Sequence, residues 1–192
     1  MSQADIDAFV ESAANGMLTP EGVTTAVVTR GIPVNGRNSG WRVTALHQAV
    51  YNKRREVVVA LLAAGANPNV TDVYGRTSVW VGAMFSTADI LQLLIDGGGG
   101  VNELSNDGET PLIVCVRYNN GDAAARLQVL LACPELDLDA KYKGKTAEEW
   151  VRRGHPELAA AIAEERARRE RWSALRAAWI AATATRSVCR YK

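Results

Sequence analysis

Apolar side chains recur along the chain in a spacing that predicts short amphipathic helices. In the segment 57–62, "VVVALL", the apolar residues form pairs one helical turn apart, and the segment 90–95, "ILQLLI", repeats the arrangement. Residues three and four positions apart lie on one face of a helix, so each segment has one face to bury. Gly65 and Gly98 follow these segments at matching positions and are expected to end the two helices.

A second set of matched segments precedes the first set and begins with threonine. The segments are "TALHQAV" (44–50), "TSVWVGA" (77–83), "TPLIVCV" (110–116) and "TAEEWVR" (146–152), and their threonines stand 33, 33 and 36 residues apart. Threonine favours a helix start because its hydroxyl accepts a hydrogen bond from a first-turn amide. The chain is therefore predicted to repeat a unit of two helices joined by loops rich in Asn, Asp and Gly, which must stack because each unit leaves apolar surface exposed.

These residues resemble the ankyrin repeats, whose unit reads D-x-x-G-x-T-P-L-H-x-A through L-L-x-x-G-A-x-x-N. The best copies are "TALHQAV…VVALLAAGANPN" and "DVYGRTSVWVGA…LQLLIDGGGGVN", and the resemblance covers roughly residues 5 to 163. His47 occupies the family's histidine position, while Trp80 and Ile113 replace it in the next two units. The resemblance implies an all-α solenoid of helix-turn-helix units with short finger loops.

Four regions are expected within this solenoid. Residues 1–35 resemble a degenerate N-terminal capping repeat, 36–139 hold three central repeats, 140–165 form a C-terminal capping repeat, and 166–192 form a basic amphipathic helix. The third unit is three residues longer than the others, and the extra length is expected between its helices, at 118–126.

The composition points to no particular partner or reaction. The chain is 47% apolar and 22% charged with a formal net charge of +1, which is typical of a globular protein. Its three cysteines fit neither a zinc site nor a disulfide framework, and no signal peptide or membrane span is recognised, so a cytoplasmic location is expected, with the nucleus as an alternative. The two histidines, His47 and His155, occupy positions that the repeats explain. We therefore expect no catalytic residues, no cofactor, no metal site and no small-molecule substrate.

The predicted function is recognition of a partner protein by the concave face of the repeats, as in an adaptor, assembly factor or inhibitor. The resemblance places the turn tips and the ends of the first helices on that face. Solubility alone favours small or charged side chains at such positions, whereas this chain places aromatic and arginine side chains there, the types enriched in binding hot spots. The candidate residues are Trp41, Tyr51, Tyr74, Arg76, Met84, Phe85, Arg117 and Tyr118, with the centre expected at Tyr74, Phe85, Arg117 and Tyr118.

The C-terminal region offers a second candidate contact at Trp172, Leu175 and Trp179, which share one helical stripe. Residues 163–192 carry a net charge of +5, whereas the rest of the chain carries −4. The favoured interpretation is that this stripe folds back onto the repeats. The alternatives are a helix offered to another protein's groove, pairing with a second copy, and binding of nucleic acid or a membrane surface. A further alternative for the whole chain is a targeting subunit of an enzyme complex.

Four consecutive glycines, Gly97–Gly100, follow the second predicted helix and lead into a turn. A phosphate-binding loop follows a strand and opens a helix, so phosphate binding is not expected here. Glycine adds unfolded-state entropy, which predicts that this junction is the softest loop of the stack. Replacing Gly99 and Gly100 with the Ala and Asn of the preceding repeat is expected to stabilise the chain, provided that the backbone angles of the two glycines permit it.

Overall fold

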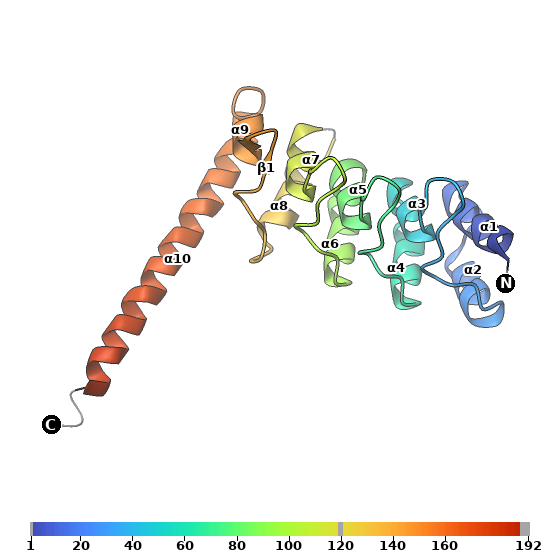
Figure 1. The fold of residues 1–192 in the computed structure, drawn as a ribbon, viewed down its shortest axis with the longest axis horizontal. Helices are drawn as coiled ribbons and strands as arrows, with labels where there is room; N and C mark the ends of the chain where they lie inside the picture. The colour runs from blue at the N-terminus through green and yellow to red at the C-terminus, as the bar shows by residue number, and fades with distance from the viewer. Residues whose placement is uncertain (1, 119–120, 189–192) are drawn as a thin grey trace.

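Helices pair and stack in chain order in the computed structural model, which describes residues 2–118 and 121–188 (Figure 1). The helices are α1 (Gln3–Ala14), α2 (Pro20–Thr24), α3 (Ala45–Tyr51), α4 (Arg55–Ala63), α5 (Ser78–Phe85), α6 (Ala88–Asp96), α7 (Pro111–Arg117), α8 (Ala123–Leu131), α9 (Ala147–Val151) and α10 (Pro156–Val188). A π-helical segment, η1 (Thr25–Thr29), continues α2, and strands β1 (Lys141–Tyr142) and β2 (Lys145–Thr146) pair antiparallel just before α9.

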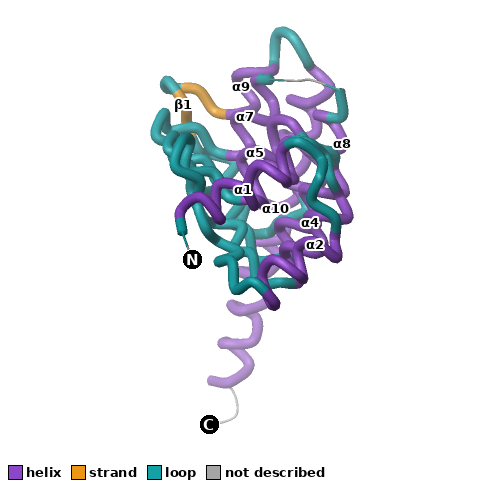
Figure 2. The backbone as a smooth tube through the Cα atoms, turned by 90° about the vertical axis from the view of Figure 1, so that its right-hand side faces the viewer, coloured by secondary structure: helices purple, strands orange, loops and turns teal. Residues whose placement is uncertain are grey.

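The odd-numbered helices form one row of the stack and the even-numbered helices form the other. In the first row α3 contacts α1 and α5, and in the second row α4 contacts α2 and α6. Figure 2 shows the loops that join one helix pair to the next, here called finger loops, gathered with the β1–β2 hairpin on one side of the helices. This arrangement confirms the predicted stack of ankyrin-like helix pairs followed by a C-terminal helix.

Threonine caps the first helix of four repeats, as the sequence predicts. The hydroxyl oxygen of each threonine accepts a hydrogen bond from the amide of the residue three positions later, which satisfies a first-turn donor. The capping residues are Thr44, Thr77, Thr110 and Thr146. The period seen in the sequence is therefore a period of helix starts.

The core runs continuously through the stack because equivalent residues of successive repeats meet. In the first row these residues are Leu46, Val79 and Leu112, and in the second row Leu61, Leu94 and Leu130, all of them buried. Each pair of helices covers the apolar face of the next pair, which is the arrangement that lets a short unit bury its side chains.

His47 joins two repeats through both of its ring nitrogens. Nδ1 lies 2.9 Å from the Thr44 hydroxyl, and Nε2 lies 3.1 Å from the carbonyl oxygen of Arg76 in the following finger loop. Burial, the largest effect, lowers the pKa of this imidazole. The structural role expected for His47 is thus confirmed, and in the next repeat Trp80 takes its place with an indole N–H that has no hydrogen-bond partner among the described residues.

Three asparagines link the loops that follow the second helices. Asn69 donates from Nδ2 to the carbonyl of Gly98 (2.8 Å) and accepts at Oδ1 from the amide of Gly100 (2.7 Å). Asn35 makes the corresponding pair of bonds one repeat earlier, and Asn102 one repeat later. These asparagines form a ladder along the stack.

The glycine run ends α6 as expected, but its residues cannot simply be exchanged for those at the matching positions of the preceding repeat. Gly98 adopts a left-handed φ of 86°, and the amide of Gly99 donates to the carbonyl of Leu94 (2.9 Å). Gly99 is buried, and a Cβ there would lie 2.7 Å from that carbonyl oxygen and closer still to Val79. The expectation that Ala at Gly99 stabilises the chain is therefore wrong.

The extra length of the third repeat lies in the connection between its helices. Residues 118–122 join α7 to α8, whereas 52–54 join α3 to α4 and 86–87 join α5 to α6. Within that connection, residues 119 and 120 lie outside the described part of the chain.

The C-terminal stripe does not fold back onto the repeats. Helix α10 runs without interruption from the last repeat and projects away from the stack (Figure 1). Trp172, Leu175 and Trp179 remain 66%, 61% and 68% exposed. The favoured interpretation was wrong because no Gly or Pro breaks the helix after Pro156, so a straight helix carries the stripe past the end of the stack.

Gly99→Ala is expected to destabilise the protein by about 1–3 kcal/mol, because the added methyl group overpacks a buried site. Urea unfolding monitored by circular dichroism measures the change. The matched control is Gly100→Ala, whose methyl group would first meet the flexible side chain of Glu103, which can move aside. Equal stability of the two variants would contradict the close packing around Gly99.

The stability of the protein is expected to fall as the pH drops below about 6.5, the ordinary pKa of histidine. The folded state lowers the pKa of His47, so the unfolded chain takes up a proton first and acidification favours unfolding. Urea midpoints at pH 7.5 and 5.5 measure the effect. The His47→Gln variant is expected to lose this pH dependence of stability, whatever its stability at pH 7.5. If the variant keeps the same pH dependence, the effect does not come from His47.

Candidate functional site

A hollow of about 390 Å³ opens between the finger loops and the first row of helices. Trp41 and Tyr74 line it from two successive finger tips, while Tyr51 lies at the end of α3 and Phe85 at the end of α5. The two tip rings stack with their centroids 5.9 Å apart, and Tyr51 meets Phe85 edge to face at 5.1 Å. The hollow is thus walled by two aromatic pairs, each of which spans two repeats.

Asp72 fixes the conformation of the second finger loop, the loop that joins α4 to α5. Its carboxylate accepts hydrogen bonds from the amides of Tyr74 (2.8 Å) and Arg76 (2.9 Å), and it forms an ion pair with the Arg76 guanidinium. Asp72 is buried, so its charge has to be paired in this way. The guanidinium lies 4.6 Å from the centre of the Tyr74 ring, and this contact fixes the ring at the rim of the hollow.

Backbone hydrogen bonds hold successive fingers together. The amide of Val73 donates to the carbonyl of Trp41 (3.0 Å), and the amide of Asn106 donates to the carbonyl of Tyr74 (2.8 Å). The aromatic tips therefore stand at a fixed separation before any partner arrives.

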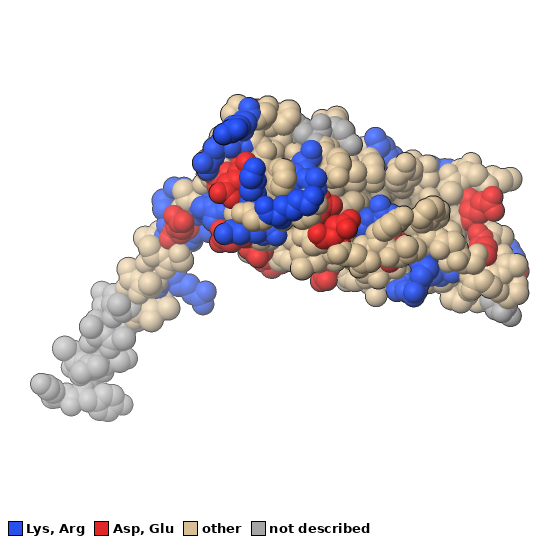
Figure 3. All heavy atoms as spheres, turned by 45° about the horizontal axis from the view of Figure 1, so that its top comes forward, with Lys and Arg blue, Asp and Glu red and all other residues tan. Residues whose placement is uncertain are grey.

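The rings around the hollow are accessible to a partner. Trp41, Tyr51 and Tyr74 are 59%, 55% and 42% exposed. Figure 3 shows a largely uncharged surface over the N-terminal repeats, whereas basic side chains gather over the closing repeat, formed by β1, β2, α9 and the start of α10. A rigid, exposed aromatic surface of this kind suits burial of apolar or aromatic groups.

Arg117 lies at the centre of a second aromatic cluster, towards the closing repeat. Its guanidinium stands 4.5 Å from the centre of the Tyr142 ring, 5.0 Å from Trp150 and 5.1 Å from Tyr118. It also forms an ion pair with Glu109, which is buried. Lys143 and, more weakly, Arg117 lower the pKa of the Tyr142 hydroxyl, which is consistent with the positive charge around it.

The structure therefore divides the predicted binding residues into two groups. Trp41, Tyr51, Tyr74, Arg76 and Phe85 line the hollow, while Arg117 and Tyr118 belong to the second cluster. Met84 packs partly buried against the core. The predicted centre, which combined Tyr74 and Phe85 with Arg117 and Tyr118, is thus spread over both groups.

Sequence reasoning did not single out Asp72 or Trp150. Asp72 occupies the aspartate position of the D-x-x-G-x-T pattern in "DVYGRT". That match was the signal in the sequence that could have identified it. The position of Trp150 within "TAEEW" gave no comparable signal, because a tryptophan on a capping helix is equally consistent with simple burial.

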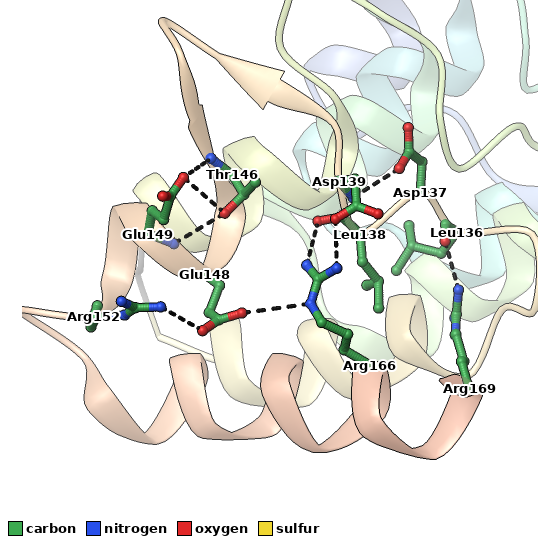
Figure 4. Close-up of polar contacts among 10 residues, drawn as sticks. All are labelled: Leu136, Asp137, Leu138, Asp139, Thr146, Glu148, Glu149, Arg152, Arg166 and Arg169. Atoms are coloured by element: carbon green, nitrogen blue, oxygen red, sulfur yellow. Dashed lines mark hydrogen bonds and ion pairs between the residues drawn. The ribbon is translucent and has the colours of Figure 1, made fainter. Parts of the chain in front are cut away.

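The base of α10 is tied to the closing repeat by arginines (Figure 4). Arg166 pairs with Asp139 (2.5 Å) and contacts Glu148, and Arg169 donates to the carbonyls of Leu136 (2.6 Å) and Cys133 (2.8 Å). Glu165 accepts from Arg168 and Arg169, and Arg168 makes the largest contribution to lowering the pKa of this carboxyl. The direction in which α10 leaves the stack is thus set by specific contacts.

The described part of the chain shows neither a metal-binding cluster nor a membrane-spanning helix. Among these residues, no group of three or more His, Cys, Asp or Glu side chains is arranged to hold a metal ion. Of the helices between residues 2 and 188, none combines the length and apolar character needed to cross a membrane.

Comparison with known proteins gives a consistent result. The family model described as ankyrin repeats (3 copies) matches residues 46–142. An ankyrin repeat-containing protein of Schizosaccharomyces pombe is 32% identical over 110 residues, which cover 49% of this chain and 53% of that protein. The Neurogenic locus Notch protein of Drosophila melanogaster is 38% identical over 92 residues, 47% of this chain and 3% of Notch.

A third relative is the tyrosine-protein kinase HTK16 of Hydra vulgaris, 39% identical over 82 residues, which are 41% of this chain and 11% of the kinase. This chain spans about half the length of the fission yeast protein and only a small share of the other two. The kinase activity in the Hydra protein's name is a property of that protein. The comparisons and the fold both show the same repeat, and the chain therefore belongs to the ankyrin repeat family.

Proposed function

We propose that this chain is a non-catalytic recognition module that binds a partner protein through the aromatic hollow of its first two central repeats. Ankyrin repeats are generally protein–protein interaction modules. The observation that supports this particular site is the pair of stacked finger-tip rings, Trp41 and Tyr74, which stay 59% and 42% exposed above a hollow. Exposed aromatic side chains held rigidly lose little entropy on binding, which favours affinity.

The chemistry of the hollow suggests what the partner presents. Its walls are aromatic rings, and its polar groups are largely engaged, since Asp72 pairs with Arg76 and His47 bonds to the backbone. A partner side chain that is apolar or aromatic fits such a surface, because it buries area without breaking an existing ion pair.

The second cluster plays a different part in this proposal. Arg117 is only 20% exposed and is engaged by Glu109 and three rings, so it joins α7 to the closing repeat. Tyr118, which is 42% exposed, is the member of that cluster best placed to extend the contact surface. The cytoplasmic location, and the role as adaptor, assembly factor or inhibitor rather than targeting subunit, stay predictions.

Tyr74→Ala combined with Phe85→Ala is expected to reduce partner capture by at least about tenfold, because residues of this kind each contribute ~2 kcal/mol or more when buried by a partner. The measurement is affinity capture from lysate of the cells that express the chain, quantified by mass spectrometry. Neither residue belongs to the fully buried core, so the melting temperature is expected to fall by only a few degrees.

Two further variants separate the surfaces. Tyr118→Ala tests whether the second cluster contributes, and Met17→Ala with Val28→Ala is the control, since it removes exposed apolar side chains that do not line the hollow. Partners that are retained by the control and lost by the Tyr74 and Phe85 variant support the proposal. Capture that is unchanged in the Tyr74 and Phe85 variant would end it.

A further inference from the structure

The exposed segment of α10, residues 170–180, carries an apolar stripe outside the repeat stack. Trp172, Leu175 and Trp179 are each more than 60% exposed, and they border a shallow hollow together with Ser173 and Arg176. Figure 3 shows this segment leaving the repeats as a mainly uncharged surface with basic side chains beside it. Large apolar side chains grouped in this way on a protein surface usually mark a contact.

The spacing of the stripe is that of a helix–helix seam. Residues 172, 175 and 179 follow the 3–4 alternation of a and d positions in a heptad, which gives a narrow seam. A helix that lies in a lipid surface needs a wider apolar face, whereas here Arg171 borders one edge of the seam and Arg176 the other. The geometry therefore favours another helix as the occupant over a membrane.

The charges beside the seam indicate which kind of helix fits. In heptad terms Arg171 is a g residue and Arg176 an e residue, the positions that face the partner's flanks. Within the described residues, neither arginine forms an ion pair, whereas Arg166, Arg168 and Arg169 at the base of α10 are all paired with carboxylates. The two arginines that have no ion pair among the described residues are thus the ones that border the exposed seam.

A second copy of the chain does not satisfy these charges. In a parallel pair, Arg171 of one helix faces Arg176 of the other. In an antiparallel pair e positions face e positions, and on this helix those are Arg169 and Arg176. Like charges across a seam are unfavourable in either orientation. Carboxylates on the partner's flanks would turn the same contacts into ion pairs.

We propose that residues 170–180 of α10 form a docking helix for an amphipathic helix of another protein, one whose apolar seam is flanked by Asp or Glu. The ion pairs and hydrogen bonds of Arg166 and Arg169 hold α10 in place, so the seam is presented in an ordered helix and little entropy is lost on pairing. This contact is separate from the aromatic hollow and does not depend on it.

The test uses a designed probe with the full-length chain. A fluorescein-labelled helical peptide of three heptads carries Leu and Ile at its a and d positions and Glu at every e and g position, so its orientation does not matter. A matched peptide carries Lys at every e and g position. Fluorescence anisotropy is expected to give about tenfold or greater preference for the Glu peptide.

Two double variants make the test specific. Trp172→Ala with Trp179→Ala is expected to weaken binding of the Glu peptide about tenfold or more, with an unchanged melting temperature because both side chains are exposed. Arg171→Glu with Arg176→Glu is expected to reverse the preference, so that the Lys peptide binds more tightly. Reversal by the charge variant cannot arise from a loss of folding.

Several results would overturn the proposal. One is equal affinity for the two peptides, or binding that survives the Trp substitutions. Another is a dimer in sedimentation velocity that the Trp substitutions abolish, which would make a second copy the occupant. A third is binding to phosphatidylglycerol vesicles, but not to phosphatidylcholine vesicles or either peptide, which would assign the helix to an anionic lipid surface.

Discussion

Every part of this structure depends on one constraint: a pair of helices of seven to nine residues cannot bury its own apolar face. Leu61 and Leu94 are fully buried only because equivalent residues of adjacent repeats cover them. Stability in such a stack is approximately a sum over neighbouring units. The polar contacts that cross between units, from His47 to the Arg76 carbonyl and from finger to finger, set the geometry in which that burial occurs.

The same constraint explains how the hollow is formed. The backbone bonds between fingers align Trp41 with Tyr74, and the row of first helices aligns Tyr51 with Phe85. Trp41 and Tyr74 thus come from loops that are hydrogen-bonded to a neighbouring loop, and Tyr51 and Phe85 from helix ends. A partner that binds there contacts two repeats at once, so binding also strengthens the junction between them.

The sequence predicts the repeat well because the period and the threonine caps report local chemistry that does not depend on distant residues. The family resemblance places Tyr74 and Phe85 on the binding face; Tyr74 is exposed there, whereas Phe85 is half-buried against the core. The sequence does not predict the close approach of Val79 to Gly99, or the rings around Arg117, because these depend on how neighbouring repeats pack together. The path of α10 was also missed, since it is set by Arg166 and Arg169 reaching groups that lie about thirty positions earlier in the chain.

The asparagine ladder has a consequence for how proteins of this kind change in length. Asn35, Asn69 and Asn102 each bond to the loop of the following repeat, so the two middle loops, which carry Asn69 and Asn102, each receive such an amide and supply one. A duplicated unit that includes its asparagine can therefore be inserted between two others with all of these bonds restored. Insertion of a partial unit would leave one loop without its amide, so the ladder favours growth and loss by whole repeats.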